Sequence, residues 1–543
     1  DKEKQKQGES GGLTMDATGA ENHTTILVIE PSEVEQNMLW AGSDDGRVHV
    51  TKNGGSTWTD VSANIPGLPK GSWIAQIKAS NKNKGEALLI ANDYRRFNYT
   101  PYAYRTKDYG TTWSRIVDGN DVKSYTLSIV EDPMNANLLF LGTDDGLYIS
   151  LNAGNQWMKW TAGFPTVSTK DLVIQPREHD LVIGTFGRAA WVLDDIRPLR
   201  AMANGNVLTK NLQLFAPPTA YQAAYQQPTG SRFGGDALFN GENKRSGAMI
   251  SYYINRPAAA KEEKKEKETA RKKKRKGTKK MEAPIVKKEL ASEVKFDSIK
   301  LEIFEGARLI RTLHQKAPKE NGIHRIYWSM NEKGADRPSR KIRKRTNEPR
   351  GVSVKPGTYN LKMSFGDQTS ESSIKVEFDP RLEMSKEAIT EIYNTSKEME
   401  KDQQLMADVV KQLVESKNTA STFKKNLTKE DKKSYKDQIK ASKDIITKID
   451  KLIAVYIGSV DKRQGITRNP EVTVSRRYSS ARRYVGSRFG HLTTTEKQLI
   501  SQYKKALEKA ISQTNAFFET DWKTYKTTLE TIHISPFKEV QKF

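Results

Sequence analysis

The sequence has no cysteine in its 543 residues, which excludes disulfides, thiolate zinc sites and cysteine nucleophiles together. It also lacks any run of about 18 apolar residues that could cross a membrane as a helix, and any apolar segment typical of a signal peptide. Its seven histidines are scattered without the spacing of metal ligands. The sequence therefore predicts no membrane span, no metal site and no cofactor, and a fold that depends on packing alone.

Positive charge is what the chain has in excess. The formal net charge is +24, and the stretch Lys261–Lys280 holds twelve basic and four acidic residues, a net +8 of that total. Smaller basic clusters lie at Arg337–Arg345 and Arg476–Arg488. Such runs can attract nucleic acid, anionic lipid or acidic glycans. We interpret the longest run as a solvated insert between two strands, and nucleic acid is not expected as a partner because only charge supports it.

One eight-residue motif occurs three times. Residues Thr51–Trp58, Thr106–Trp113 and Ser150–Trp157 each read Ser/Thr-x-Asn/Asp-x-Gly-x-x-Trp, with the tryptophans 55 and 44 residues apart. This period suits the four-stranded blade of a β-propeller. The Asn or Asp side chain can close a turn, Gly supplies a positive φ, and Trp covers the blade. We interpret the motif as a structural fastener made by Thr51, Asn53, Gly55, Trp58, Thr106, Asp108, Gly110, Trp113, Ser150, Asn152, Gly154 and Trp157.

Short strands separated by turn residues fill residues 23–200 and group into three full blades and a fragment. The turns Gly42–Gly46 and Gly142–Gly146 occupy the same place in two blades, and each contains Asp-Asp-Gly, a strong hairpin signal. About 3–4 blades fall short of a closed propeller, and an open one exposes sheet faces and edges. We therefore expect the missing blades to come from an upstream segment of the same polypeptide or from a separate blade-bearing chain.

The rest of the chain predicts two further domains. Residues 201–245 read as a linker, and residues 246–380 alternate apolar and polar residues as an immunoglobulin-like β-sandwich does, with a basic insert at 257–295. Residues 381–543 predict a helical bundle. Its long helices are expected at Ser385–Lys417, Lys429–Ile457 and Thr493–Ile532, the last with a Thr493–Glu496 capping box. Residues 1–22 read as a flexible segment, and the expected fold class is mainly β with an α tail.

The cluster Arg476–Arg488 interleaves arginine with tyrosine. Such a pattern is found in proteins that bind single-stranded nucleic acid, but its spacing also suits a short helix. We favour the helix, which would bury Tyr478, Ala481, Tyr484 and Val485 and leave Arg476, Arg477, Arg482 and Arg483 in solvent.

The motifs occur together in an order that resembles one protein family. Besides the three eight-residue motifs they are Trp40–Gly46, Gly184–Arg188, Gly322–Trp328 and Pro356–Tyr359. The chain resembles the C-terminal half of large bacterial proteins with sortilin-like or BNR (Asp-box) repeats, often named glycosyl hydrolases. The resemblance implies a propeller begun upstream, an immunoglobulin-like module, a helical tail and export to the periplasm, the outer membrane or the outside of a bacterium. The chain departs from the family at Phe186, where His is common.

One loop departs from the blade pattern and is the candidate binding site. Residues 92–102 place several aromatic and basic side chains between a strand and the second Asp-box, and irregular loops of this kind often bind ligands. The alternative is that these aromatics cap a blade edge against the missing blades. The candidate residues for glycan or partner binding are Asp93, Tyr94, Arg95, Arg96, Phe97, Tyr99 and Tyr102.

Two functions from different classes follow. The one we favour is a non-catalytic binding or scaffolding component of a bacterial envelope or secreted assembly, with protein partners and with glycan as a further ligand. The alternative is a glycoside hydrolase acting on a polysaccharide, which needs two carboxylates roughly 5 to 10 Å apart and a site shared with the missing blades. The carboxylates available are Asp44, Asp45, Asp93, Asp144 and Asp145, and the aromatics that could stack on sugars are Trp40, Trp73, Tyr94, Phe97, Tyr99 and Tyr102. We assign no catalytic residue.

Overall fold

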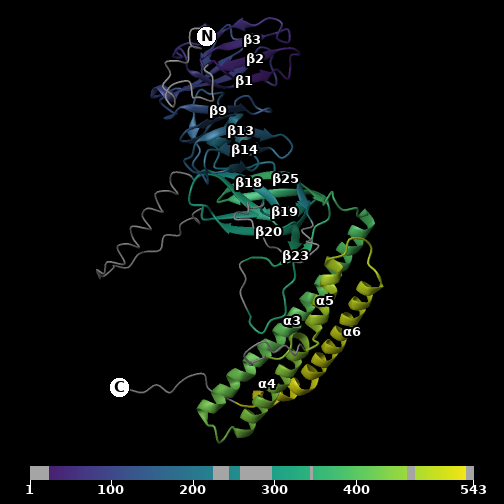
Figure 1. Cartoon of the computed structure of the whole chain (residues 1–543). Coiled ribbons are helices and arrows are strands. Elements are labelled where there is room, and N and C mark those ends of the chain that lie inside the picture. Colours follow the sequence, from purple (N-terminus) through teal and green to yellow (C-terminus); the bar gives the residue numbers. More distant parts are fainter. Residues whose placement is uncertain (1–23, 224–243, 257–295, 343–346, 461–470, 533–543) are drawn as a thin grey trace, which may run out of the picture. The chain divides into compact units, whose positions relative to one another are not determined.

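The computed structural model of the chain describes residues 24–223, 244–256, 296–342, 347–460 and 471–532 (Figure 1). The predicted N-terminal segment 1–22 and the whole basic insert 257–295 lie outside these residues. Contacts divide the chain into two compact units. Among the described residues, the first comprises 24–218, 251–256 and 320–325, and the second comprises 219–223, 244–250, 296–319, 326–342, 347–460 and 471–532.

The first unit contains four antiparallel sheets, which we call blades 1 to 4. In each of them consecutive strands are neighbours, and the first three have four strands while the fourth has three. Blade 1 is β1 (Ile26–Pro31), β2 (Leu39–Ser43), β3 (Val48–Thr51) and β4 (Thr59–Asp60); blade 2 is β5 (Trp73–Ala79), β6 (Ala87–Asp93), β7 (Asn98–Thr106) and β8 (Ser114–Arg115). Blade 3 is β9 (Thr126–Glu131), β10 (Leu139–Thr143), β11 (Gly146–Ser150) and β12 (Met158–Lys159); blade 4 is β13 (Thr169–Gln175), β14 (Asp180–Thr185) and β15 (Ala190–Leu193). The predicted propeller-type blades are confirmed.

Neighbouring blades pack face to face. Strand β5 contacts β1 and β2, β9 contacts β5 and β6, and β13 contacts β9 and β10. One apolar cluster joins Trp40 of blade 1 to Ile77 of blade 2, and another joins Phe140 of blade 3 to Leu172 of blade 4. The packing is close enough that a Cβ at Gly42 would lie 2.5 Å from the Ile74 side chain. The first unit is therefore a row of stacked blades with a propeller-like fold.

The segment 201–245, predicted as a linker, contains helical and strand residues in the part that the structure describes. Helix α1 (Arg197–Ala203) runs into it, strand β16 (Leu212–Leu214) pairs with β18 (Ala248–Ile254), and strand β17 (Ala220–Gln222) pairs in parallel with β25. The apolar side chains of Leu212, Leu214 and Ala220 are buried, and this burial with the added ladder bonds stabilises the segment as strand.

The second unit begins with the predicted β-sandwich. Its larger sheet has the order β17-β25-β24-β19-β20, formed by β19 (Ser298–Glu305), β20 (Arg308–Lys316), β24 (Gly357–Phe365) and β25 (Gln368–Phe378) with β17. Strand β21 (Gly322–Trp328) lies in the sheet of β16 and β18, and β22 (Asn331–Lys333) pairs with β23 (Arg350–Ser353). The indole of Trp328 meets the ring of Tyr359 edge-on at 5.5 Å, and alternate residues of β19 and β24 are buried. This alternation is what the sequence predicted.

A helical bundle completes the second unit (Figure 1). It consists of α3 (Lys386–Glu430), α4 (Lys436–Ile457), α5 (Val474–Gly486) and α6 (Thr494–Phe517), which continues through a π-helical turn (Phe518–Trp522) into α7 (Lys523–Glu530). Helix α3 packs on α4 and α5, and α6 packs on α4 and α5. The capping box at Thr493 and Glu496 is confirmed. Helix α3 runs beyond its predicted end at Lys417 because Ala420 and Leu427 continue its buried stripe.

The predicted short helix in the cluster Arg476–Arg488 is α5. Tyr478, Ala481 and Val485 are buried as expected, but Tyr484 is 44% exposed. The three buried residues are spaced by three and four, as one helix face requires, and Tyr484 falls beside that face.

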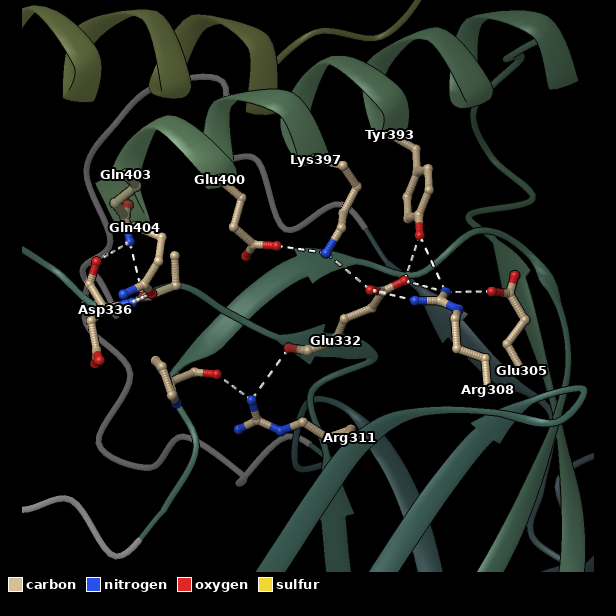
Figure 2. Close-up of polar contacts among 12 residues, drawn as sticks. Glu305, Arg308, Arg311, Glu332, Asp336, Tyr393, Lys397, Glu400, Gln403 and Gln404 are labelled. Carbon is tan, nitrogen blue, oxygen red and sulfur yellow. Dashed lines mark hydrogen bonds and ion pairs between the residues drawn. The ribbon is translucent and has the colours of Figure 1, made fainter. Parts of the chain in front are cut away.

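One buried carboxylate attaches α3 to the sandwich (Figure 2). Glu332 on β22 is only 3% exposed and lies 2.8 Å from the Arg308 guanidinium and 3.1 Å from the Lys397 ammonium of α3. The Tyr393 hydroxyl of α3 donates a hydrogen bond to the same carboxylate. Burial alone would raise the pKa of Glu332, but the hydrogen bonds from Arg308, Tyr393 and Lys397 outweigh it and lower the pKa to about 2.

We expect Glu332→Gln to destabilise the second unit by roughly 2 to 4 kcal/mol at neutral pH, because two cations lose their buried partner. The folded-state pKa lies below the ordinary value of 4.5, so the stabilisation is complete above about pH 4.5 and is lost as the pH falls toward 2. Urea unfolding followed by far-UV circular dichroism measures the difference between wild type and variant. That difference shrinks on acidification.

Glu371→Gln is the matched control, since Glu371 is largely exposed and pairs with Lys362 at 3.5 Å. Its effect is expected to stay below about 1 kcal/mol. A Glu332→Gln variant as stable as this control at neutral pH would contradict the role assigned to Glu332.

Candidate functional site

The three eight-residue motifs, which we call boxes, share one hydrogen-bond pattern. The Thr106 hydroxyl accepts from the Gly110 N–H at 2.9 Å and donates to the Asp108 carboxylate at 2.9 Å, and that carboxylate accepts from the Thr112 N–H at 2.8 Å. The hydrogen bonds from Thr112 lower the pKa of Asp108. The corresponding bonds link Thr51, Asn53, Gly55 and Thr57 in the first box, and Ser150, Asn152, Gly154 and Gln156 in the third. The polar groups of each box are thus engaged in closing its own turn.

The box glycines adopt the left-handed conformation that the turn requires. Their φ angles are 93° at Gly55, 80° at Gly110 and 94° at Gly154. The tryptophans differ: Trp113 and Trp157 are buried, whereas Trp58 is 42% exposed. The Trp157 indole N–H donates to the Ile116 carbonyl of blade 2 at 2.8 Å, so the third box also joins two blades.

The candidate binding loop lies at the other end of the blades. Because strands alternate in direction, the β2–β3, β6–β7 and β10–β11 turns lie at one end of the row and the boxes lie at the opposite end. The loop that follows β6 is one turn of 3-10 helix, Tyr94–Arg96, and ends at Phe97 with a left-handed φ of 58°. It occupies the place of the Asp-Asp-Gly turns of blades 1 and 3.

Polar contacts hold the base of this loop. The Asp93 carboxylate accepts from Arg96 Nε at 2.6 Å and from Asn98 Nδ2 at 3.1 Å, and Arg96 also donates to the Lys70 carbonyl at 2.8 Å. Tyr102 is buried beneath the loop. Asp93, Arg96 and Tyr102 therefore shape the loop from within.

The aromatic residues of the loop spread toward blade 3. The Tyr94 ring stacks on Tyr125 with centroids 4.7 Å apart, and Tyr99 lies 6.1 Å from the same ring. The Arg95 guanidinium lies 3.0 Å from the centre of the Trp73 ring. Phe97 and Tyr99 remain 85% and 55% exposed. The loop thus presents two aromatic rings to solvent on a base held by neighbouring blades.

Tyr125 lies against this loop, although the sequence did not single it out. Burial and a hydrogen bond to Asp144 raise the pKa of Tyr125. Its contacts with Tyr94 and Tyr99 come from the next blade. Only the packing of blade 2 on blade 3 could reveal them.

The aspartates proposed for hydrolysis are engaged in turns. Asp44 accepts from the backbone N–H groups of Thr24 and Thr25 at 2.8 and 2.9 Å, and Asp45 accepts from the Ser43 hydroxyl. Asp145 bonds Thr143, Tyr148 and Lys159. Burial would raise the pKa of Asp145, but the hydrogen bonds from Lys159 and Thr143 hold it below its ordinary value, which is the wrong direction for a general acid.

Two of the aromatics proposed to stack on sugars are unavailable. Trp40 has no exposed surface and packs in the core between blades 1 and 2, and Tyr102 is also buried. The Arg95 guanidinium lies over Trp73. Trp73 and Tyr94 are half-buried, and Phe97 and Tyr99 are the exposed members of the set.

A cavity of about 340 Å³ at the box end of the blades holds carboxylates that the sequence did not single out. Arg105 bridges Glu86 at 2.8 Å and Glu131 at 2.9 Å. Burial raises the pKa of Glu131 despite Arg105, and burial raises the pKa of Glu30 despite Lys78. The three carboxylates were missed because Glu30, Glu86 and Glu131 come from different blades. They form a group only because the blades stack.

No helix in the described residues is long and apolar enough to cross a membrane. They also contain no group of three or more His, Asp or Glu side chains placed to hold a metal ion.

Comparisons with known proteins reveal only partial likenesses. No protein-family model matches the sequence, and no curated protein matches it. Among solved structures, YCF48 from Cyanidioschyzon merolae is 17% identical with a TM-score of 0.22, over 32% of this chain and 56% of that one. The GH74 xyloglucanase from Xanthomonas campestris is 14% identical with a TM-score of 0.24, over 33% of this chain and 30% of that one. A structure of YCF48 bound to D1 peptide is 14% identical with a TM-score of 0.21, over 32% of this chain and 70% of that one.

The chain thus spans roughly a third to a half of the length of the first two structures. The assignment of the blades rests instead on their strand order, their register and the shared bonding of the boxes.

We expect Gly110→Ala to destabilise the blades by about 2 to 4 kcal/mol. Its φ is +80°, and an added Cβ would lie 2.9 Å from the Val61 side chain, so backbone strain and overpacking add. Thermal unfolding measures the loss, and Gly119→Ala is the control because nothing lies within 4 Å of a Cβ there. Equal stability of the two variants would contradict the fastening role of the box.

Proposed function

We propose that the chain is a non-catalytic binding or scaffolding component whose row of blades is completed by further blades of the same kind. The support comes from one repeated position. One position on the first strand of each blade is equivalent in all four blades. It is occupied by Ile29, Ile77, Ile129 and Leu172, which pair on the second strand with Ala41, Leu89, Leu141 and Ile183.

The exposure of this position differs sharply along the row. Ile77, Ile129 and Leu172 are 0%, 0% and 1% exposed because the preceding blade covers them, whereas Ile29 is 61% exposed. The equivalents of Ile29 are core residues, so its exposure to water indicates that a further blade would pack against this face of blade 1.

The same difference in side-chain exposure is found at the opposite end of the row. Val192 of blade 4 occupies the position of Val50 in blade 1 and Ile149 in blade 3. It is 55% exposed, whereas Val50 and Ile149 are 4% and 2% exposed. Both outer faces of the row therefore favour coverage, by an upstream segment of the same polypeptide or by a separate blade-bearing chain.

The binding surface in this proposal is the loop around Phe97. Phe97 and Tyr99 are exposed aromatics beside the charges of Arg95 and Arg96, a composition common in protein contact sites. A protein partner in an exported bacterial assembly is the ligand we propose first, and a glycan second. Location in a bacterial envelope rests on the sequence resemblance.

The alternative, a glycoside hydrolase, is favoured by one observation only. Glu30 and Glu131 line one cavity, and burial raises the pKa of each, as a general acid requires. The aspartates considered from the sequence have no such support.

Completion of the row is tested with Ile29→Lys in the protein purified from its source, using native mass spectrometry and peptide mapping. We expect the wild type to carry additional blade sequence. If the further blades belong to a separate chain, the variant loses that partner. If they belong to the same chain, the variant is destabilised by about 2 to 4 kcal/mol. Thr59→Lys, on the exposed outer strand of blade 1, is the control and leaves both unchanged. A stable wild-type monomer with no further blades would contradict the proposal.

Catalysis is tested separately by incubating the protein with plant, algal and bacterial glycans and assaying new reducing ends. We expect no release. Release that disappears in Glu131→Gln would overturn the non-catalytic assignment in favour of the hydrolase, whereas release that survives this change and Glu30→Gln would indicate a contaminating enzyme.

A further inference from the structure

A cavity of about 680 Å³ lies in the second unit against one face of α5. Helix α5 contributes Ser475, Ser479, Arg482 and Arg483, which recur at the spacing of one helix face. The other walls come from the segment after β22, with Arg337, and from α3 and the end of α4. Every charged residue in the lining is an arginine.

The three arginines of this lining have exposed side chains. In the ranges that the structure describes, the side chains of Arg337, Arg482 and Arg483 form no hydrogen bond or ion pair. By contrast, Arg308 of the same unit is bound by Glu332. Three guanidinium groups in one cavity repel one another unless an anion neutralises them.

The carboxylates of α3 near this cavity are already engaged. Glu400 lies 2.6 Å from the Lys397 ammonium, and Asp402 accepts from the Tyr503 hydroxyl at 2.8 Å. Gln403, next to Asp402 on α3, lines the cavity and directs its amide N–H groups to the carbonyls of Ala335 and Asp336 (Figure 2). The lining of this cavity itself contains no negatively charged residue.

A second, independent observation concerns Ser475. Its hydroxyl oxygen is buried and has no hydrogen-bond partner, although buried polar atoms are nearly always bonded. Since Ser475 lines the same cavity as the three arginines, an anion there would accept from this hydroxyl as well as from the guanidinium groups.

The arginines also adjoin apolar surface. Met406 and Ile457 line the same cavity, and a neighbouring cavity of about 580 Å³ shares Arg482 and Tyr478 with it and adds Ile392 and Met399. The combined space exceeds what a bare inorganic ion occupies. It fits a molecule that has an organic part next to its anionic group.

We propose that this cavity binds a soluble organic phosphate, with the phosphate held by Arg337, Arg482, Arg483 and Ser475 and the organic part on the adjoining apolar lining. Phosphate matches the donor set because planar guanidinium groups bind its oxygens in bidentate fashion. The proposal does not depend on completion of the blades.

The test is isothermal titration of the full chain with glucose 6-phosphate, with glucose and inorganic phosphate as the two halves of that probe. We expect glucose 6-phosphate to bind more tightly than either half. The variant Arg482→Gln/Arg483→Gln weakens this binding at least about tenfold, since it removes charge-assisted hydrogen bonds. Ser475→Ala weakens it about threefold to tenfold while leaving the melting temperature unchanged or raised.

The matched control is Arg476→Gln/Arg477→Gln, which removes the same charge from exposed positions of the same helix outside the cavity lining. It is expected to change binding less than about twofold. An equal loss in both double variants, or no binding of any phosphate probe, would overturn the proposal.

A vesicle arm separates the soluble source from a lipid headgroup. Vesicles of phosphatidylglycerol with phosphatidylcholine are compared with phosphatidylcholine alone. Binding to the anionic vesicles that needs Arg482 and Arg483, without binding of glucose 6-phosphate, would overturn the assignment to a soluble ligand.

Discussion

An antiparallel blade has two apolar faces, and water against either face costs free energy in proportion to the apolar area exposed. Blades 2 and 3 cover both faces by stacking between neighbours, and from this constraint follow the close contact at Gly42 and the buried positions of Ile77 and Ile129. It also places Glu30 and Glu131, from different blades, around one cavity. The features of the first unit that bear on function arise where blades meet or where a neighbour is absent.

The second unit depends on a different interaction. Glu332 is buried among Arg308, Tyr393 and Lys397, so a single carboxylate links β20, β22 and α3. Its charge is stabilised because its partners together outweigh the cost of burial. With α3 held in this way, α5 packs on α3 and directs one row of its arginines into a shared cavity. The anion site thus depends on the attachment of the first long helix.

The sequence predicted those features that are encoded locally. Each eight-residue motif closes its own turn, and the Thr493 capping box lies within one helical turn, so both can be read from spacing alone. Features joined across the chain could not be read in this way, such as Glu332 with Lys397, 65 residues apart. The same reason explains the error at Trp40, which looked available for sugar stacking because nothing in its neighbourhood in sequence identifies blade 2 as its cover. The strands β16 and β17 were missed because their partners lie far along the chain.

A row of blades that contact only their neighbours behaves as a one-dimensional array, in which each end unit lacks one of the two interfaces that stabilise an inner unit. We therefore expect local opening to begin at the two ends of the row, and amide protons of β1 and β15 to exchange sooner than those of β6 and β10. Closing the ring would remove both ends in a single step, so the gain in cooperativity from the last blade would exceed the gain from any blade added before it.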